Sequence, residues 1–187
     1  MEKTKPNIIL IHGNNGGEAE GGRGDDYWFP YAVQEFEKMG CKVTAKTFPD
    51  PCVASSSIWL PFIKNECSAN ENSILIGHSS GAIAAMRYAE NNKILGSVLV
   101  GTYHSDIGDE NERQSGYFEN PWDWDVIKKN QKWIIQFSSE DDPYFSFEEP
   151  MFVYEKLNTE LHKFEDRGHF FNLEFPELVE AVKQKLI

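Results

Sequence analysis

The sequence contains little of what marks nucleic-acid-binding, membrane or secreted proteins. Its 18 basic residues are outnumbered by 30 acidic ones, for a net charge of −12. Such a surface repels phosphate backbones and anionic lipids, so we expect neither nucleic acid nor a membrane as a partner. No apolar run is long enough to span a bilayer, and residues 1–6 lack the apolar core of a signal peptide. We therefore expect a soluble cytoplasmic protein, with the nucleus as the alternative compartment.

Cysteine and metal-binding motifs are also scarce. The three cysteines, Cys41, Cys52 and Cys67, show no C-x-x-C spacing. Their odd number and spacing predict reduced thiols, not a disulfide framework or a metal site. The H-E-x-x-H motif and the two glycine-rich phosphate-binding motifs are absent as well. The sequence therefore predicts no metal and no other cofactor.

Short apolar runs alternate with amphipathic segments along the chain. Four runs, at 7–11, 73–76, 95–100 and 133–137, are typical of strands buried on both faces, whereas 42–48 and 161–164 alternate in polarity as edge strands do. Helical patterns separate them, at 30–39, 55–63, 81–88, 122–127, 148–157 and 176–186, and residues 101–121 read as a long irregular segment. This alternation predicts one α/β domain over residues 1–187, with helices on both faces of a six-stranded, mainly parallel sheet and no separate lid domain.

The character of the strands also predicts their order. Right-handed crossovers, with the second and sixth strands at the edges, favour the order 2-1-3-4-5-6. In that order the winding direction reverses between the first and third strands, and open α/β sheets bind ligands in the crevice formed there. The third strand leads into Ser79, and the first leads into the loop that starts at Gly13.

The surroundings of Ser79 give the strongest functional signal. Residues 77–81, Gly-His-Ser-Ser-Gly, match G-x-S-x-G between a predicted strand and a run of good helix formers. In this setting the pattern predicts a nucleophile elbow, a strained turn that exposes the serine hydroxyl above the sheet. The helix that follows directs its free N–H groups and its dipole toward a negative charge forming beside Ser79.

A serine nucleophile requires a base and an acid that orients the base. On this fold the acid and then the histidine follow the serine along the chain. His169 follows the sixth strand and is our candidate base. Asp142 follows the fifth strand and is favoured as the acid by the Asp-Pro-apolar-apolar pattern that it opens, with Asp141 as the alternative and Glu140, nearer the strand end, less favoured. The alternative for all three is a non-catalytic role, in an acidic turn that faces water.

The oxyanion that forms during acyl transfer requires two backbone donors. Ser80 N–H is one by position, and Asn14 N–H, in the loop after the first strand, is the best candidate for the other. Residues 16–26 are glycine-rich and acidic, so we expect a mobile rim of the site there, in preference to a phosphate cradle. The side chains expected to line the substrate pocket are His12, His104, Tyr117, Phe118, Trp122 and Phe170. The alternative for His12 is a hydrogen bond that shapes its own turn, and for the aromatic residues a place in the core.

Several long runs of the sequence resemble one family. Residues 57–62, 76–90, 109–113, 115–118, 161–164 and 168–170 are similar to the retinoblastoma-binding protein 9 family, small serine hydrolases of the α/β-hydrolase superfamily. The resemblance covers nearly the whole chain and implies a lid-less hydrolase fold with a triad on Ser79, Asp142 and His169.

The same resemblance raises the question of a protein partner. The family is named for binding retinoblastoma protein through a Leu-x-Cys-x-Glu motif. Residues 65–69 are here Asn-Glu-Cys-Ser-Ala, without the leucine and the glutamate. The resemblance therefore does not extend that partner to this chain by that route.

Together these features predict a metal-independent serine hydrolase. We expect it to cleave a small ester, thioester or amide through an acyl-enzyme, with a small acyl compound as its substrate. The alternatives are an acyltransferase that uses the same triad and a protein-interaction module in which the triad is idle.

Overall fold

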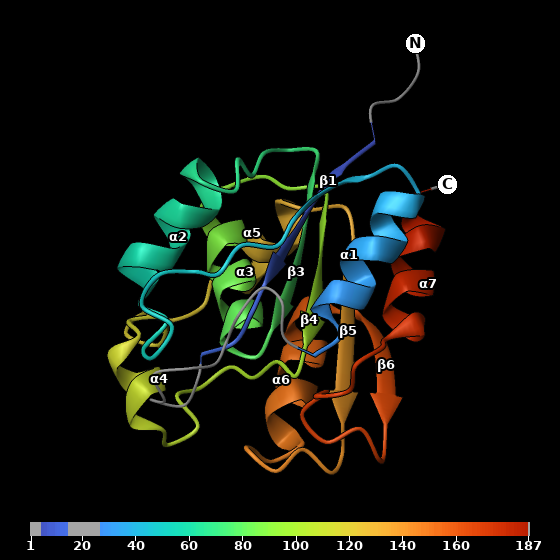
Figure 1. Cartoon of the computed structure of the whole chain (residues 1–187). Helices are drawn as coiled ribbons and strands as arrows, with labels where there is room; N and C mark the ends of the chain where they lie inside the picture. The colour runs from blue at the N-terminus through green and yellow to red at the C-terminus, as the bar shows by residue number, and fades with distance from the viewer. Residues whose placement is uncertain (1–4, 15–26, 187) are drawn as a thin grey trace.

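A six-stranded parallel sheet forms the centre of the molecule (Figure 1). The computed structural model describes residues 5–14 and 27–186, so the predicted acidic rim at 16–26 lies outside the described residues. The strands are β1 (Asn7–Ile11), β2 (Lys42–Thr44), β3 (Ser73–His78), β4 (Gly96–Val100), β5 (Ile134–Ser139) and β6 (Glu160–Phe164). Their order is β2-β1-β3-β4-β5-β6, and each neighbouring pair is parallel. The predicted order is confirmed.

The edge strand β2 is shorter than the predicted 42–48. It pairs with β1 only as far as Thr44. Beyond that point Phe48 is held by other contacts, because its N–H donates to His12 Nε2 over 2.7 Å and its ring packs against Trp59 with centroids 4.9 Å apart. Burial of an aromatic ring therefore takes the chain away from the sheet edge.

Helices cover both faces of the sheet. They are α1 (Phe29–Lys38), α2 (Ser56–Asn65), α3 (Ser80–Asn91), α4 (Glu110–Gln114), α5 (Trp124–Lys129), α6 (Glu148–Leu157) and α7 (Pro176–Lys185). α1 and α7 pack on one face, and α2, α3, α5 and α6 pack on the other (Figure 1). Buried aliphatic and aromatic side chains fill a core on each face. Among the described residues, no helix combines the length and apolar composition that crossing a bilayer requires.

The segment between β4 and α5 is more ordered than the sequence predicted. It contains α4, whose N-terminus is capped by Asp109: one carboxylate oxygen accepts the N–H groups of Asn111 and Glu112 at 2.9 and 3.0 Å. α5 likewise begins after a capping residue, Asp123, and so starts two residues later than expected. Both corrections follow from aspartates that cap helices.

Candidate active site

Ser79 occupies the sharp turn between β3 and α3. Its backbone has φ 55° and ψ −125°, a conformation that a residue with a side chain rarely adopts. Its N–H donates to the carbonyl of Val100 over 2.9 Å. A Cβ at Gly77 would lie 2.2 Å from Gly81 O, and one at Gly81 would lie 2.1 Å from Ile11 O. The two glycines are therefore required for the turn to pass this close to the backbone around it.

The loops after β5 and β6 bring Asp142 and His169 together. His169 Nδ1 lies 2.7 Å from Asp142 Oδ2, and both side chains are almost fully buried, at 5% and 3% exposure. The second oxygen of Asp142 accepts the N–H of Tyr144 over 3.0 Å. An imidazole that donates its Nδ1 proton to a carboxylate carries its lone pair on Nε2, which is the arrangement of a general base.

His169 also lies at the end of the sheet that bears Ser79. A Cβ on Gly101 would lie 3.2 Å from His169 Cε1, and Gly101 follows Val100, the residue that accepts the Ser79 N–H. In addition, His78 Nε2 donates to the carbonyl of His169 over 2.7 Å. Burial, together with the neighbouring His169, lowers the pKa of His78 to about 3, so this ring is neutral and serves as a tie between the two loops.

The two alternative acids have other partners. Asp141 Oδ1 accepts hydrogen bonds from Ser139 Oγ at 2.5 Å and from Gly168 N–H at 2.8 Å. These bonds, the one from Ser139 above all, lower the pKa of Asp141. Glu140 forms an ion pair with Lys163. Asp141 therefore fixes the loop that carries His169, and Asp142 is the residue that contacts the imidazole.

The buried carboxylate of Glu112, which no sequence pattern singles out, lies beside Ser80. Ser80 Oγ donates to Glu112 Oε1 over 2.6 Å and lies 3.2 Å from the hydroxyl of Tyr103. Asn14 Nδ2 donates to the same Glu112 oxygen over 2.7 Å, and Asn14 N–H points at Ser80 Oγ over 3.4 Å. The two residues expected to supply the oxyanion donors are thus joined through one glutamate.

Comparisons with known proteins show the family to which the chain belongs. The family model described as serine hydrolase matches residues 8–175. Serine hydrolase RBBP9 of Rattus norvegicus is 48% identical over 179 residues, which are 95% of this chain and 94% of that protein. The chain belongs to the RBBP9 serine hydrolase family. The resemblance inferred from the sequence is therefore confirmed, and family membership supports hydrolase function.

Solved structures extend the likeness in fold. The ydeN gene product of Bacillus subtilis superposes with a TM-score of 0.84 at 20% identity, covering 97% of this chain and 98% of that chain. An esterase of Pyrococcus furiosus, PF2001, superposes with a TM-score of 0.63 at 18% identity, covering 98% of this chain and 83% of that chain. At these identities the likeness concerns the fold alone, and it confirms the predicted α/β-hydrolase architecture.

Two of the residues expected to line the substrate pocket, His12 and Phe170, are buried in contacts with the rest of the protein. His12 is buried, its Nε2 accepts the N–H of Phe48, and its Nδ1 lies 2.7 Å from the carbonyl of Gly13. It therefore shapes its turn, which was the alternative interpretation. Phe170 is 0% exposed and stacks on Phe175 with centroids 5.3 Å apart, in the core beneath α7. The pocket assignment of Phe170 is corrected to a core position.

The residue next to Phe170 has the exposed position instead. Phe171 is 41% exposed, and its ring centroid lies 5.2 Å from that of His169. Tyr144 is also exposed and contacts His169 edge-on at 4.6 Å. The sequence pattern predicted neither of these exposed contacts to His169. The backbone of Phe170 has φ +58°, so a left-handed turn lies between the buried ring of Phe170 and the exposed ring of Phe171.

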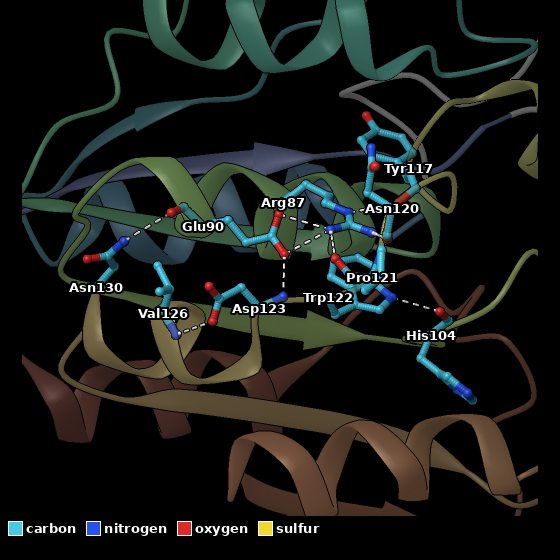
Figure 2. A network of polar contacts seen from close by, with 10 residues as sticks. All are labelled: Arg87, Glu90, His104, Tyr117, Asn120, Pro121, Trp122, Asp123, Val126 and Asn130. Carbon is cyan, nitrogen blue, oxygen red and sulfur yellow. Dashed lines mark hydrogen bonds and ion pairs between the residues drawn. The ribbon is translucent and has the colours of Figure 1, made fainter.

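The other four expected pocket residues lie on the side of the sheet that carries α3 and α6, and we call them the wall: His104, Tyr117, Phe118 and Trp122. His104 Nδ1 lies 2.6 Å from Glu149 Oε2, and the His104 ring stacks on Phe152 at 4.0 Å. The carbonyl of His104 accepts the indole N–H of Trp122 over 2.8 Å (Figure 2). Phe118 packs against the ring of Tyr103, and Tyr117 is fully buried. These contacts fix the wall.

Arg87 on α3 holds that wall in place. Its Nε donates to Tyr117 O over 2.7 Å, its Nη2 to Asn120 O over 2.6 Å, and its Nη1 to Glu90 over 2.8 Å, while the guanidinium lies 3.6 Å from the centre of the Trp122 ring (Figure 2). Arg87, Glu90, Tyr117 and Asn120 border a surface pocket of about 340 Å³, whose lining does not include Ser79, Asp142 or His169. Within the described part of the chain, no cluster of three or more His, Cys, Asp or Glu side chains could hold a metal ion.

Proposed function

We propose that the protein hydrolyses a small ester, thioester or amide through an acyl-enzyme on Ser79. The observation that carries the proposal is the 2.7 Å contact between His169 Nδ1 and Asp142 Oδ2, in a loop bonded through His78 to the serine turn. It supports a general base whose tautomer is fixed by a buried carboxylate and whose free nitrogen is Nε2.

The reaction then proceeds in two halves. Ser79 Oγ attacks the substrate carbonyl as His169 Nε2 takes the hydroxyl proton, and the carbonyl electron pair moves onto oxygen. The oxyanion is stabilised by Ser80 N–H at the start of α3 and by Asn14 N–H from the loop after β1. Collapse of this intermediate expels the leaving group, which receives the proton from His169. Water repeats the sequence, releasing the acid and restoring Ser79.

Labelling by a fluorophosphonate probe tests the proposal. The wild type should be labelled, and Ser79→Ala should lose both labelling and turnover of a panel of acyl esters and aminoacyl amides. Ser57→Ala, at an exposed serine on α2, is the matched control and should label as the wild type does. Full labelling of Ser79→Ala would place the nucleophile elsewhere.

Two other functions make different predictions. An acyltransferase would use the same acyl-enzyme, and product analysis with a competing alcohol or amine distinguishes transfer from hydrolysis. A protein-interaction module with an idle triad predicts a wild type that reacts with the probe no faster than free serine does. The interaction route that gives the family its name is disfavoured, because Cys67 is buried in the core and the residues around it lack the motif.

For the compartment we propose the cytoplasm. Cys41 and Cys67 are free, buried thiols. Burial raises the pKa of both, that of Cys67 to about 11. Such thiols are unreactive and are typical of proteins kept in reducing surroundings. Fluorescence microscopy of the tagged chain checks the assignment.

A further inference from the structure

We propose that Glu112 is a positioning residue that holds the oxyanion-stabilising groups of the site together. The inference rests on the proposed function, since it concerns how the same oxyanion is stabilised. Its basis is that a single oxygen, Glu112 Oε1, accepts hydrogen bonds from Ser80 Oγ and from Asn14 Nδ2, at 2.6 and 2.7 Å. Ser80 and Asn14 are the two residues whose backbone N–H groups are proposed to bind the oxyanion.

These two residues come from separate parts of the fold. Ser80 opens α3, directly after the nucleophile, and Asn14 lies in the loop after β1. Backbone donors stabilise an oxyanion only when both point at the same position, and an error of about 1 Å can lower the rate about 100-fold. Glu112 links the two segments through their side chains. The Asn14 N–H is directed at Ser80 Oγ over 3.4 Å, so a substrate oxygen would take the place of this hydroxyl as its acceptor.

The position of Glu112 is costly, which argues against a role in stability alone. The residue is 3% exposed, and among the described residues no lysine or arginine forms an ion pair with it. Its second oxygen, Oε2, is buried and accepts no hydrogen bond of good geometry in the described part of the chain, although the Tyr103 hydroxyl lies close enough to interact with the carboxylate. Burial, above all, raises the pKa of Glu112. Burial of a carboxylate without a neighbouring cation costs stability. A contribution to stability alone therefore does not explain why a glutamate occupies this position.

The local structure directs Glu112 inward. α4 is capped by Asp109, and the exposed residues Glu110 and Arg113 form an ion pair on its outer side. The helix therefore does not need the Glu112 side chain for its own termini. Tyr103 completes the cluster, because its hydroxyl lies 3.2 Å from Ser80 Oγ.

Substitution of Glu112 distinguishes positioning from a structural role. Glu112→Ala should lower kcat about 10- to 100-fold with KM changed less than about threefold, because the donors lose their alignment. The rate of fluorophosphonate labelling should fall in parallel. Glu112→Gln should stay within about threefold of the wild type, because its amide oxygen can still accept both hydrogen bonds. Glu110→Ala, at a glutamate 65% exposed on the same helix, is the matched control and should leave kcat unchanged.

A second variant keeps the inference testable if Glu112→Ala unfolds. Asn14→Ala removes the side-chain tether and retains the backbone N–H, so it should lower kcat by itself while its melting temperature stays near that of the wild type. The double variant should be no slower than Glu112→Ala alone, because both act through one link. Wild-type kcat in Asn14→Ala, or fully multiplicative losses in the double variant, would overturn the inference. If Ser79→Ala abolishes labelling and Glu112→Ala labels normally, the inference fails and the proposed function stands.

Discussion

His78 Nε2 donates a hydrogen bond to the backbone carbonyl of His169 over 2.7 Å. The residue before the proposed nucleophile thereby holds the loop that carries the proposed base. The bond joins β3 to the loop after β6, which are separated by two strands in the sheet. His78 and His169 are about 90 residues apart in the chain, so no local sequence pattern predicts this hydrogen bond.

His78→Phe tests this tie. The ring volume is roughly kept, but the buried carbonyl of His169 loses its donor, which should reduce the free energy of unfolding by about 1–3 kcal/mol. The looser loop should also lower kcat. Urea denaturation measures the first effect and steady-state kinetics the second. His162→Phe, at a histidine near the sheet edge that pairs with Glu160, is the control and should leave kcat unchanged.

The pH dependence of stability should carry the signature of His78. Its pKa is about 3 in the folded protein and 6.5 in an ordinary environment, so between these values the unfolded chain binds a proton that the folded chain does not. Stability therefore falls as the pH drops below 6.5, with a contribution of up to about 1.4 kcal/mol per pH unit. Denaturation of the wild type and His78→Phe at pH 5.0 to 6.5 compares the slopes. The wild type should be steeper, and equal slopes would show that the buried ring does not contribute.

Asp142 and Asp141 should differ in their effect on catalysis. Asp142→Asn removes the carboxylate that fixes the His169 tautomer, and losses of about 10⁴ in kcat are typical of this change. Asp141→Asn retains an oxygen able to accept the bonds from Ser139 and Gly168, so we expect a loss of less than about tenfold. Kinetics of the two variants with one ester substrate decide between the acids. A larger loss in Asp141→Asn would reverse the assignment.

Arg87 should matter for stability more than for chemistry. Arg87→Ala leaves three carbonyls without their donor and the mostly buried Glu90 without its cation, so the free energy of unfolding should fall by about 3 kcal/mol. The matched control is Arg113→Ala, whose ion pairs are exposed and are expected to contribute less than about 1 kcal/mol. Urea denaturation of both variants measures the difference.

The sheet and the main candidates of the site could be predicted because their signals are local. Continuous apolar runs distinguished the inner strands from the edges, and G-x-S-x-G between a strand and a helix selected Ser79. Chain order alone selected His169, since the loops after neighbouring parallel strands open on one edge of the sheet. The first two inferences depend on residues within about one element of one another, and the third depends on the order of the strands.

What the sequence did not predict depends on contacts through space or on single backbone angles. Glu112 stands in a run of acidic residues on a short helix and has no distinguishing pattern, and its proposed role depends on Asn14, 98 residues away. Phe170 and Phe171 are adjacent aromatics, one buried and one exposed, and the left-handed turn at Phe170 between them is not a feature of the sequence pattern. Hydrophobic periodicity cannot assign such pairs, because the turn between them is not regular.

The close approach of α3 to β1 limits how this protein could be redesigned. The Ile11 carbonyl comes so near Gly81 that a single added methyl would collide with it, so a mutant library aimed at new substrates gains nothing from varying that turn. Diversity is better placed in the exposed rings around the histidine, Tyr144 and Phe171. There a change of shape alters the surroundings of His169 and leaves the backbone around Ser79 as it is.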